Sequence, residues 1–391
     1  MRTLKLLLTS FGLLLSGSSL LFAQGQGSQH AAVLVPDSTI EHAQDVGIRA
    51  HTNHLIRINP QFTGTAPAGE TPASIRAVYN LPSGGGSGTI AIVDAFDYPT
   101  AENDLGVFSS QFSLPACTTA NGCFRKVYAS GSKPRSNCGW AQEAALDIEW
   151  AHAMAPSAKI VLVEAATNSF ADLFTAVNVA TSQVTTGGGA GEVSMSWGGS
   201  EFSSEASNDG HFQNNNVVYF ASSGDTGGVN IYPSTSPYVV SAGGTTIHRA
   251  GGAFTGETAW SGSGGGPSKY ENKLSYQSGV AGTDAIKRSA PDFSFDADPN
   301  SGVSVYDSTR CQGLNGWLVF GGTSVSSPSL AGIVNHAGGA PDTVSELTTI
   351  YSGLGTSNFR DITSGSAGSF SAHSGWDFVT GVGSDLGLNG K

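Results

Sequence analysis

The stretch that decides the fold runs from Trp317 to Pro328 and reads WLVFGGTSVSSP. Four apolar residues predict a strand, two glycines predict a tight turn, and the small and apolar residues that follow predict a helix. Glycines at a strand-to-helix turn let the backbone pass close to a substrate. Ser324 is then expected at the helix N-terminus, where free N–H groups and the dipole favour developing negative charge. This arrangement presents a nucleophilic hydroxyl, although a glycine turn followed by a capping serine is also common in α/β proteins.

Upstream of this stretch, strand candidates alternate with helix candidates. Strands are expected at 89–93, 124–128, 159–163, 193–197 and 217–220, and helices at 71–79, 100–112, 141–155 and 170–183. This alternation predicts an α/β fold with a mostly parallel central sheet and helices on both faces. Ligands gather beyond the carboxyl ends of strands in open sheets of this kind. Because Asp94, Asp225 and Ser324 each follow a predicted strand, we expect them at one edge.

The beginning of the chain indicates export. Residues 1–23 combine a basic start, a short apolar core and a small residue, Ala23, which is typical of a secretory signal peptide. Serines interrupt the apolar run, which is short for a membrane anchor. Only 12% of the 391 residues are charged and the net charge is −12, so the basic face of a nucleic-acid-binding protein is absent. We expect a secreted monomer, extracellular or periplasmic, without membrane contact after signal removal.

The four cysteines are expected to form disulfides in an exported protein, and four cysteines allow three connectivities. Cys117 and Cys123 bracket a turn-like segment, which favours a local pairing. Cys138 and Cys311 then either form the second bridge or stay free. No histidine lies at ligand spacing from these cysteines, so a zinc site is not expected.

Two carboxyl groups lie in the predicted helix 141–155. Glu143 and Asp147 are four residues apart and therefore share one helix face. Like charges at that distance push their pKa values apart and leave one carboxyl readily protonated. The apolar flanks indicate a helix buried against the sheet, where an acidic pair requires a functional reason. A separate glycine turn, residues 220–228, carries Asp225, which either forms the turn or directs its carboxyl group at a reaction centre.

These motifs together resemble the sedolisin family, the serine-carboxyl peptidases, which are related in fold to subtilisin. The resemblance extends from about Thr71 to Asp385 and includes, in family order, SMSWG at 194–198, SGD at 223–225, WSGSGGG at 260–266, residues 291–299 and GTSVSSP at 322–328. It implies a subtilisin-like peptidase domain over 71–391. Residues 24–70 are polar and poorly periodic, and we interpret them as a leader or short pro-segment. Family members usually carry a large folded prodomain, whereas fewer than fifty residues separate the predicted signal from the catalytic domain here.

The resemblance also implies roles for the site residues. Ser324 would be the nucleophile, Glu143 the general base and later acid, and Asp147 the carboxyl that orients and tunes Glu143. Asp225 would supply the oxyanion-hole carboxyl beside the Ser324 N–H. A carboxylate base operates in acid, where a histidine is protonated, and an aspartate that donates to an oxyanion must itself be protonated. Two further candidates for supporting positions are Asp94 and Trp197.

The end of the chain resembles the family's calcium loop. One structural Ca²⁺ would be held by carboxylates and backbone carbonyls, the hard oxygen ligands that this ion prefers. The carboxylates would come from Asp361 and Asp377, and the carbonyls from Ile362, His373 and Gly375. His373 replaces the usual glycine, but only its carbonyl oxygen is needed. The alternative is a pair of ordinary loop aspartates.

The predicted function is that of a secreted, acid-acting serine-type endopeptidase that cleaves proteins or peptides through a Ser324 acyl-enzyme. One alternative is a non-catalytic, peptide-binding relative, in which loss of a catalytic residue would be expected. Another is a subtilisin-type Asp-His-Ser peptidase that uses Asp94 and Ser324. That alternative needs a suitably placed histidine. His152 lies five residues past Asp147, on a different helix face, and is more typical of a structural residue.

Overall fold

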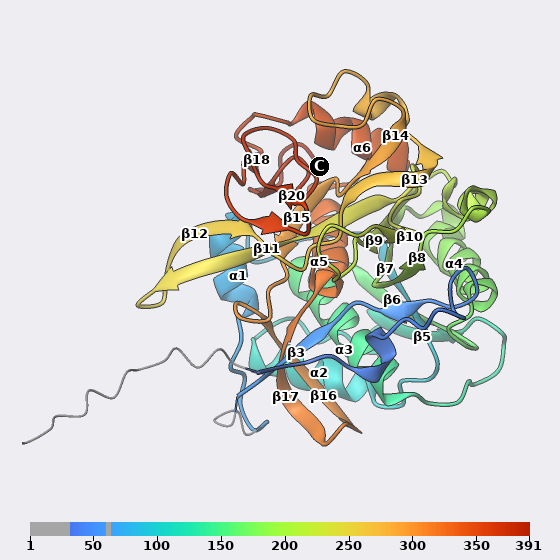
Figure 1. Cartoon of the computed structure of the whole chain (residues 1–391). Coiled ribbons are helices and arrows are strands. Elements are labelled where there is room, and N and C mark those ends of the chain that lie inside the picture. The colour runs from blue at the N-terminus through green and yellow to red at the C-terminus, as the bar shows by residue number, and fades with distance from the viewer. Residues whose placement is uncertain (1–31, 60–63) are drawn as a thin grey trace, which may run out of the picture. The chain divides into compact units, whose positions relative to one another are not determined.

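A mostly parallel sheet crosses the middle of the molecule (Figure 1). The computed structural model describes residues 32–59 and 64–391, so the predicted signal peptide and residues 24–31 lie outside the described residues. The sheet order is β18 (Phe359–Arg360), β21 (Ser384–Asp385), β15 (Phe293–Asp296), β11 (Val240–Ala250), β9 (Val217–Ser222), β7 (Gly191–Met195), β4 (Thr89–Ala95), β6 (Lys159–Ala165) and β5 (Phe124–Tyr128). Neighbours on this path are parallel except β18 and β21, and β12 (Ala253–Ala259) pairs antiparallel with β11. The predicted α/β fold class is confirmed.

Helices cover both faces of this sheet. They are α1 (Pro72–Tyr79), α2 (Ala101–Gln111), α3 (Cys138–Met154), α4 (Phe170–Thr185), α5 (Thr323–Ala337) and α6 (Thr343–Ser352). Successive side chains of a strand point to opposite faces. On β4, Ile90 and Ile92 therefore join the core that contains α3 and α5, while Ala91 and Val93 join the core under α4. The three catalytic candidates on α3 and α5 thus lie in helices on the same side of the sheet.

Smaller sheets lie beside the central one. An antiparallel sheet has the order β1 (Ala32–Leu34), β3 (Leu55–Ile58), β17 (Leu314–Gly321) and β16 (Val303–Cys311). A second has the order β10 (Ile231–Tyr232), β8 (Trp197–Ser200) and β2 (His51–Thr52). The remaining strands form two pairs, β13 (Gly266–Asn272) with β14 (Lys287–Ala290) and β19 (Ser366–Ala367) with β20 (Phe370–Ser371). Residues 32–391 form one compact unit, so the described part of the predicted leader packs with the peptidase domain.

Two sequence predictions differ from the structure in detail. Helix α3 begins at Cys138 rather than at 141, because the Asn137 side chain accepts hydrogen bonds from the Gly139 and Trp140 amides (3.0 and 3.2 Å). The predicted strand 193–197 is divided at Ser196 into β7 and β8, which belong to different sheets. This division brings β8 out of the central sheet and makes it available to pair with β2.

Both disulfides are present as expected from the sequence, Cys117–Cys123 and Cys138–Cys311. The second joins the first turn of α3 to the end of β16.

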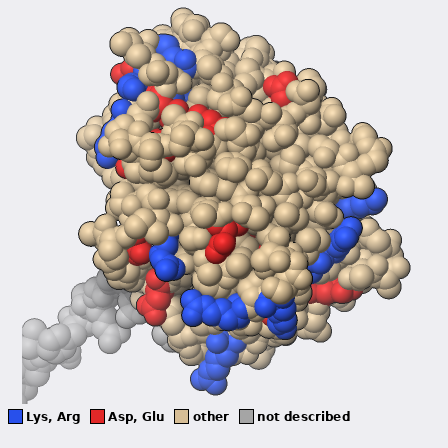
Figure 2. Space-filling model, turned by 90° about the vertical axis from the view of Figure 1, so that its right-hand side faces the viewer, with Lys and Arg blue, Asp and Glu red and all other residues tan. Residues whose placement is uncertain are grey.

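Within the described ranges, no helix combines the length and the apolar character needed to cross a membrane. One face of the molecule carries few charged side chains, in keeping with the low charged fraction (Figure 2).

Candidate active site

Ser324 lies in the first turn of α5, directly after the turn that ends β17. Gly322 has φ of 96°, a left-handed conformation that favours glycine. A Cβ at Gly322 would lie 2.2 Å from the carbonyl oxygen of Asn53 and 2.5 Å from Asp225 Oδ2, so no side chain fits there. The Ser324 N–H donates to the Asn53 carbonyl (3.1 Å), and its hydroxyl donates to the Ser196 carbonyl (3.3 Å). The double glycine therefore lets the backbone around the serine approach a peptide carbonyl closely.

Glu143 and Asp147 reach Ser324 from α3. Both carboxyl groups are fully buried, and the Ser324 side chain lies near enough to Glu143 to oppose part of the rise in its pKa. Asp147 Oδ1 accepts a hydrogen bond from Ser196 Oγ (2.8 Å). The spacing of four residues thus places both carboxyls on the helix face toward α5. The structure brings these three predicted residues together.

Burial dominates the electrostatics of this group. It raises the pKa of Glu143 to about 8, and together with the Glu143 charge it raises the pKa of Asp147 well above its ordinary value. Asp94 joins them, with its pKa raised by burial and then by the charges of Asp147 and Glu143. Both Asp94 oxygens, Asp147 Oδ2 and Glu143 Oε1 have no hydrogen-bond partner among the described residues. Three buried carboxyls that meet in this way must hold protons between them.

Asp225 lies on the other side of the nucleophile turn. Its Oδ1 accepts hydrogen bonds from the Thr323 N–H and hydroxyl, both at 2.8 Å. Its Oδ2 has no hydrogen-bond partner among the described residues and shares the space beside Gly322 with the Asn53 carbonyl oxygen. Burial raises the pKa of Asp225 to about 7. A protonated Oδ2 can therefore donate to an oxygen held by the Ser324 N–H.

The structure does not bring His152 to this group. Its Nε2 lies 2.9 Å from the Pro115 carbonyl, and the ring is close to the sulfurs of Cys117 and Cys123. Those sulfurs form a disulfide and are not available as thiolate ligands. The His152 version of the Asp-His-Ser hypothesis is therefore not supported. Of the supporting candidates, Trp197 donates from Nε1 to the Val93 carbonyl (2.8 Å), which ties β8 to β4.

Sequence reasoning missed two residues of this site, Asn53 and His54. The Asn53 N–H donates to Glu143 Oε2 (3.1 Å), and His54 Nδ1 lies 2.8 Å from the same oxygen. His54 is fully buried, stacks on Phe320 and has its pKa lowered to about 4 by burial. No motif surrounds either residue. The alternation of residues 55–58 is a weak strand signal, but it does not reveal what the strand pairs with.

The predicted calcium ligands lie in one loop region. Asp361 accepts hydrogen bonds from Ser374 Oγ (3.0 Å) and the Gly375 N–H (3.3 and 3.2 Å). Asp377 accepts them from the N–H groups of His373 (3.2 Å), Val379 and Thr380 (both 2.9 Å) and from the Thr380 hydroxyl. Neither carboxylate forms an ion pair with Lys or Arg in the part of the chain that the structure describes. His373 has no positive φ, so it replaces a glycine without backbone strain. Two carboxylates in one loop region without a cationic side chain have the ligand chemistry that a hard cation prefers.

No protein-family model matches the chain. Sedolisin from Pseudomonas sp. (strain 101) is 34% identical over 205 residues, which cover 48% of this chain and 33% of that protein. Kumamolisin from Bacillus sp. (strain MN-32) is 30% identical over 369 residues, which cover 83% of this chain and 63% of that protein. The chain therefore spans between one third and just under two thirds of the length of these curated relatives.

The matches to solved structures agree with these sequence matches. Pseudomonas sedolisin, a serine-carboxyl proteinase in complex with two molecules of pseudo-iodotyrostatin, matches with a TM-score of 0.68 at 26% identity, covering 82% of this chain and 96% of that one. Sphericase matches with a TM-score of 0.54 at 19% identity, covering 82% and 99%, which shows a likeness of fold alone. Two similar sequences and a match that covers 96% of the solved Pseudomonas chain support the assignment of this chain to the sedolisin family.

Proposed function

We propose that the protein is an exported serine-carboxyl endopeptidase that hydrolyses protein or peptide substrates in acid. The observation that carries the proposal is the packing of α3 against α5, which places the buried carboxyl of Glu143 where the Ser324 side chain influences its pKa. A buried carboxyl has little structural reason to face a serine at a helix N-terminus. Such a carboxyl does have a chemical role, because it can accept the proton of the serine hydroxyl.

In the proposed reaction, Glu143 accepts a proton in one step and returns it in the next. Ser324 Oγ would attack the substrate carbonyl carbon while its proton passes to Glu143. The oxyanion would be held by the Ser324 N–H and by the protonated Asp225 carboxyl. Glu143 would return the proton to the leaving amine, and water would then hydrolyse the acyl-enzyme by the same path. Asp147, fixed by Ser196 Oγ, would hold Glu143 in place.

Buried carboxyls outside the site also suit acid conditions. Burial raises the pKa values of Glu149, Glu164, Glu192 and Asp296, with Glu164 at about 8. Below the ordinary carboxyl pKa, the folded and unfolded chains both carry these protons, so the number of bound protons does not change on folding. As pH rises toward the folded-state pKa, only the unfolded chain loses the protons, and stability falls. The fold is therefore favoured in acid.

Activity is expected to fall as pH rises through about 7, and to fall again on the acid side, where the buried Glu143 holds a proton and cannot accept that of the serine. Asp225 has its pKa raised to about 7 by burial, so above that pH it loses the proton that it would donate to the oxyanion. The pH profile of kcat/KM on a denatured protein substrate measures this and tests the proposed function. A maximum at alkaline pH would contradict a carboxyl-based mechanism.

Replacing Asp225 by alanine should lower kcat by about 10²–10³, the scale for loss of one oxyanion-hole donor. Asp225→Asn should lose less, because its amide donates without titrating, and it should flatten the alkaline side of the pH profile. Steady-state kinetics of both variants separate kcat from KM. An effect confined to KM would assign Asp225 to the substrate cleft alone.

We further propose that one calcium ion binds at Asp361 and Asp377, with backbone carbonyls of Ile362, His373 and Gly375. Its role would be stability, since a metal that binds only the folded state raises the free energy of unfolding by about 2.7 kcal/mol at a hundredfold excess over Kd. Chelation should therefore lower the melting temperature of Ser324→Ala, which cannot digest itself, at mildly acidic pH. An unchanged melting temperature together with no bound metal by elemental analysis would leave the two aspartates as ordinary loop residues.

A further inference from the structure

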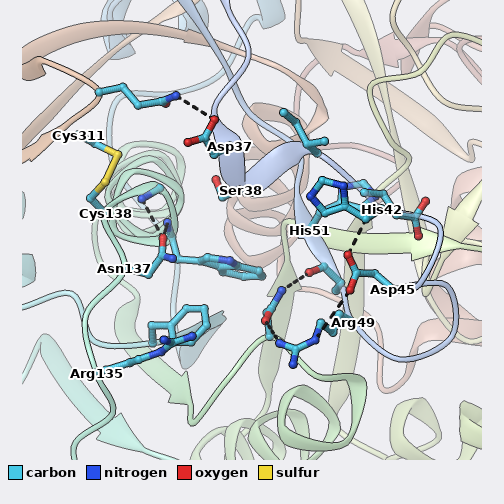
Figure 3. A pocket seen from close by; sticks show the side chains of 18 residues that line it. Asp37, Ser38, His42, Asp45, Arg49, His51, Arg135, Asn137, Cys138 and Cys311 are labelled. Atoms are coloured by element: carbon cyan, nitrogen blue, oxygen red, sulfur yellow. Dashed lines mark hydrogen bonds and ion pairs between the residues drawn. A yellow bond between two sulfur atoms is a disulfide. The ribbon is translucent and has the colours of Figure 1, made fainter.

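Two pockets of the molecule differ in the charges that line them. The pocket in Figure 3, beside the first turn of α3, has a volume of about 340 Å³ and carries both signs of charge, because Asp45, Arg49 and Arg135 line it. A second pocket, the basic pocket, has a volume of about 460 Å³ and is lined by Arg125, Lys159 and uncharged residues. Among the described residues that line the basic pocket, none is Asp or Glu.

The two basic side chains project from the same face of the central sheet. Strand β5 is an edge strand of that sheet and β6 is its neighbour (Figure 1). Arg125 on β5 lies opposite Val161 on β6, two residues after Lys159, and Val161 belongs to the core under α4. Because side chains alternate between faces, Arg125 and Lys159 both lie on the α4 side. Strands about 4.8 Å apart with a rise of about 3.3 Å per residue put the two Cα atoms about 8 Å apart, so both side chains can reach one ligand.

Neither basic group has a partner in the part of the chain that the structure describes. Most of the described Lys and Arg side chains form ion pairs, hydrogen bonds or contacts with aromatic rings. Those without any such interaction are Arg125, Lys159, Lys269 and Arg310, and two of these four line the basic pocket. The chain has 30 acidic residues against 18 Lys and Arg, so a pair of cations without a carboxylate is unexpected.

The surroundings do not neutralise this pair. Like charges on adjacent strands repel each other. The last turn of α4 lines the same pocket with Gln183 and Val184. A helix C-terminus contributes only about half a negative charge, whereas the two side chains carry two positive charges. A bound anion would supply the rest.

Backbone hydrogen bonds join the walls of the basic pocket. The Lys159 N–H donates to the Gly88 carbonyl (3.1 Å), and the Ile160 N–H donates to the Cys123 carbonyl (2.8 Å). The Cys117–Cys123 disulfide closes the loop before β5. A pocket whose walls are held in this way needs little rearrangement on binding, which lowers the entropic cost of holding a ligand.

We propose that the basic pocket binds a tetrahedral oxyanion, the phosphate or sulfate group of a free ion or of an ester on a protein substrate. The planar guanidinium of Arg125 would bind two of its oxygens, and the ammonium of Lys159 would bind a third. The site is separate from the catalytic group. Lys159 lies opposite Thr89, five residues before Asp94, so about 17 Å of strand separates the pocket from the buried carboxyls.

The acid conditions of the proposed function favour these anions over carboxylates. A carboxylate ligand gains a proton near pH 4. A phosphate monoester has its second pKa at about 6 and keeps one negative charge below it. Protonation of exposed carboxyls also makes the net charge of −12 less negative, which weakens the repulsion of an anion. The carboxylate of Glu102 on α2 faces the loop before β5, where it accepts hydrogen bonds from the Thr119 N–H and hydroxyl (2.8 and 2.7 Å).

Binding is measured by isothermal titration of Ser324→Ala with sodium phosphate and with sodium sulfate at acidic pH, with sodium chloride keeping the ionic strength constant. This variant cannot digest itself, and the measurement does not depend on peptidase activity. Saturable binding of one ion per chain is expected. Absence of saturable binding for both ions would overturn the proposal.

Two double variants in the Ser324→Ala background locate the site. Arg125→Gln with Lys159→Gln should raise Kd about tenfold or more, because both charge-assisted donors are lost. Lys269→Gln with Arg310→Gln removes the same charge at exposed positions outside the pocket and should change Kd by about twofold at most. Equal Kd values for the two double variants would assign the binding to net charge and overturn the site.

Kinetics of the native protein distinguish the two sources of the anion. The substrates are a denatured phosphoprotein and the same protein after phosphatase treatment. If the ester is the ligand, the phosphorylated form should have a KM several-fold lower with kcat unchanged, and Arg125→Gln with Lys159→Gln should remove that difference. Equal KM values together with saturable binding of the free ions would assign the pocket to the free ion. If neither substrate is digested while the titration shows binding, the proposed function fails and the basic pocket stands.

Discussion

Replacing Ser324 by alanine is expected to lower kcat for peptide hydrolysis by about a million-fold, the scale for loss of the serine nucleophile in subtilisin. Alanine removes only the hydroxyl, which donates to the Ser196 carbonyl. The first turn of α5 keeps its backbone contacts, so the fold and the melting temperature should change little. Single-turnover assays on a fluorogenic peptide at acidic pH give the rate, and circular dichroism checks the fold.

Ser326→Ala is the matched control for this variant. Ser326 is a buried serine on the same helix, and its hydroxyl donates to the Phe295 carbonyl (3.4 Å) rather than to the carboxyl pair. It should retain nearly full activity. Substantial turnover by Ser324→Ala, with Ser326→Ala equally active, would remove Ser324 from the role of nucleophile.

Glu143→Gln is expected to lower kcat/KM by about 10⁴-fold, because an amide of the same shape accepts no proton from the serine hydroxyl. Asp147→Asn should also cause a large loss, since it removes the carboxyl that shares protons with Glu143 while keeping an acceptor for Ser196 Oγ. The measurement is kcat/KM across a pH series. Loss of the acid limb of the profile in Glu143→Gln would identify the titrating base.

Glu149→Gln provides the control on the same helix. Glu149 is a buried carboxyl two residues beyond Asp147, and it accepts the Tyr306 N–H (3.0 Å) instead of facing Ser324. Its replacement should leave activity nearly unchanged. His152→Ala should do the same. If His152→Ala were as damaging as Glu143→Gln, a histidine-based mechanism would be the better account.

The parts of the site that were predictable are those with local rules. A spacing of four residues is enough to put Glu143 and Asp147 on one face of α3, and a glycine pair before Ser324 is enough to begin α5. The Cys117–Cys123 pairing also follows from a short intervening turn. These features depend on neighbouring residues, so the sequence alone indicates them.

The parts that were not predictable depend on distant strand pairing. Strand β17 reads as an apolar strand of the central sheet, yet its partners are β3 and β16, and nothing local specifies that choice. Asn53 and His54 reach the site only because β2 pairs with β8 while β3 pairs with β17. Register between segments so far apart is set by packing in the whole fold.

The Cys138–Cys311 disulfide has a mechanical consequence. It ties the first turn of α3, five residues before the proton acceptor, to the hairpin whose second strand leads into the nucleophile. Proton transfer between a serine and a carboxyl is sensitive to displacements well below the length of one bond. Reduction of this disulfide is therefore expected to slow the reaction. It would loosen the alignment of α3 with the β16–β17 hairpin without altering any atom that touches the substrate.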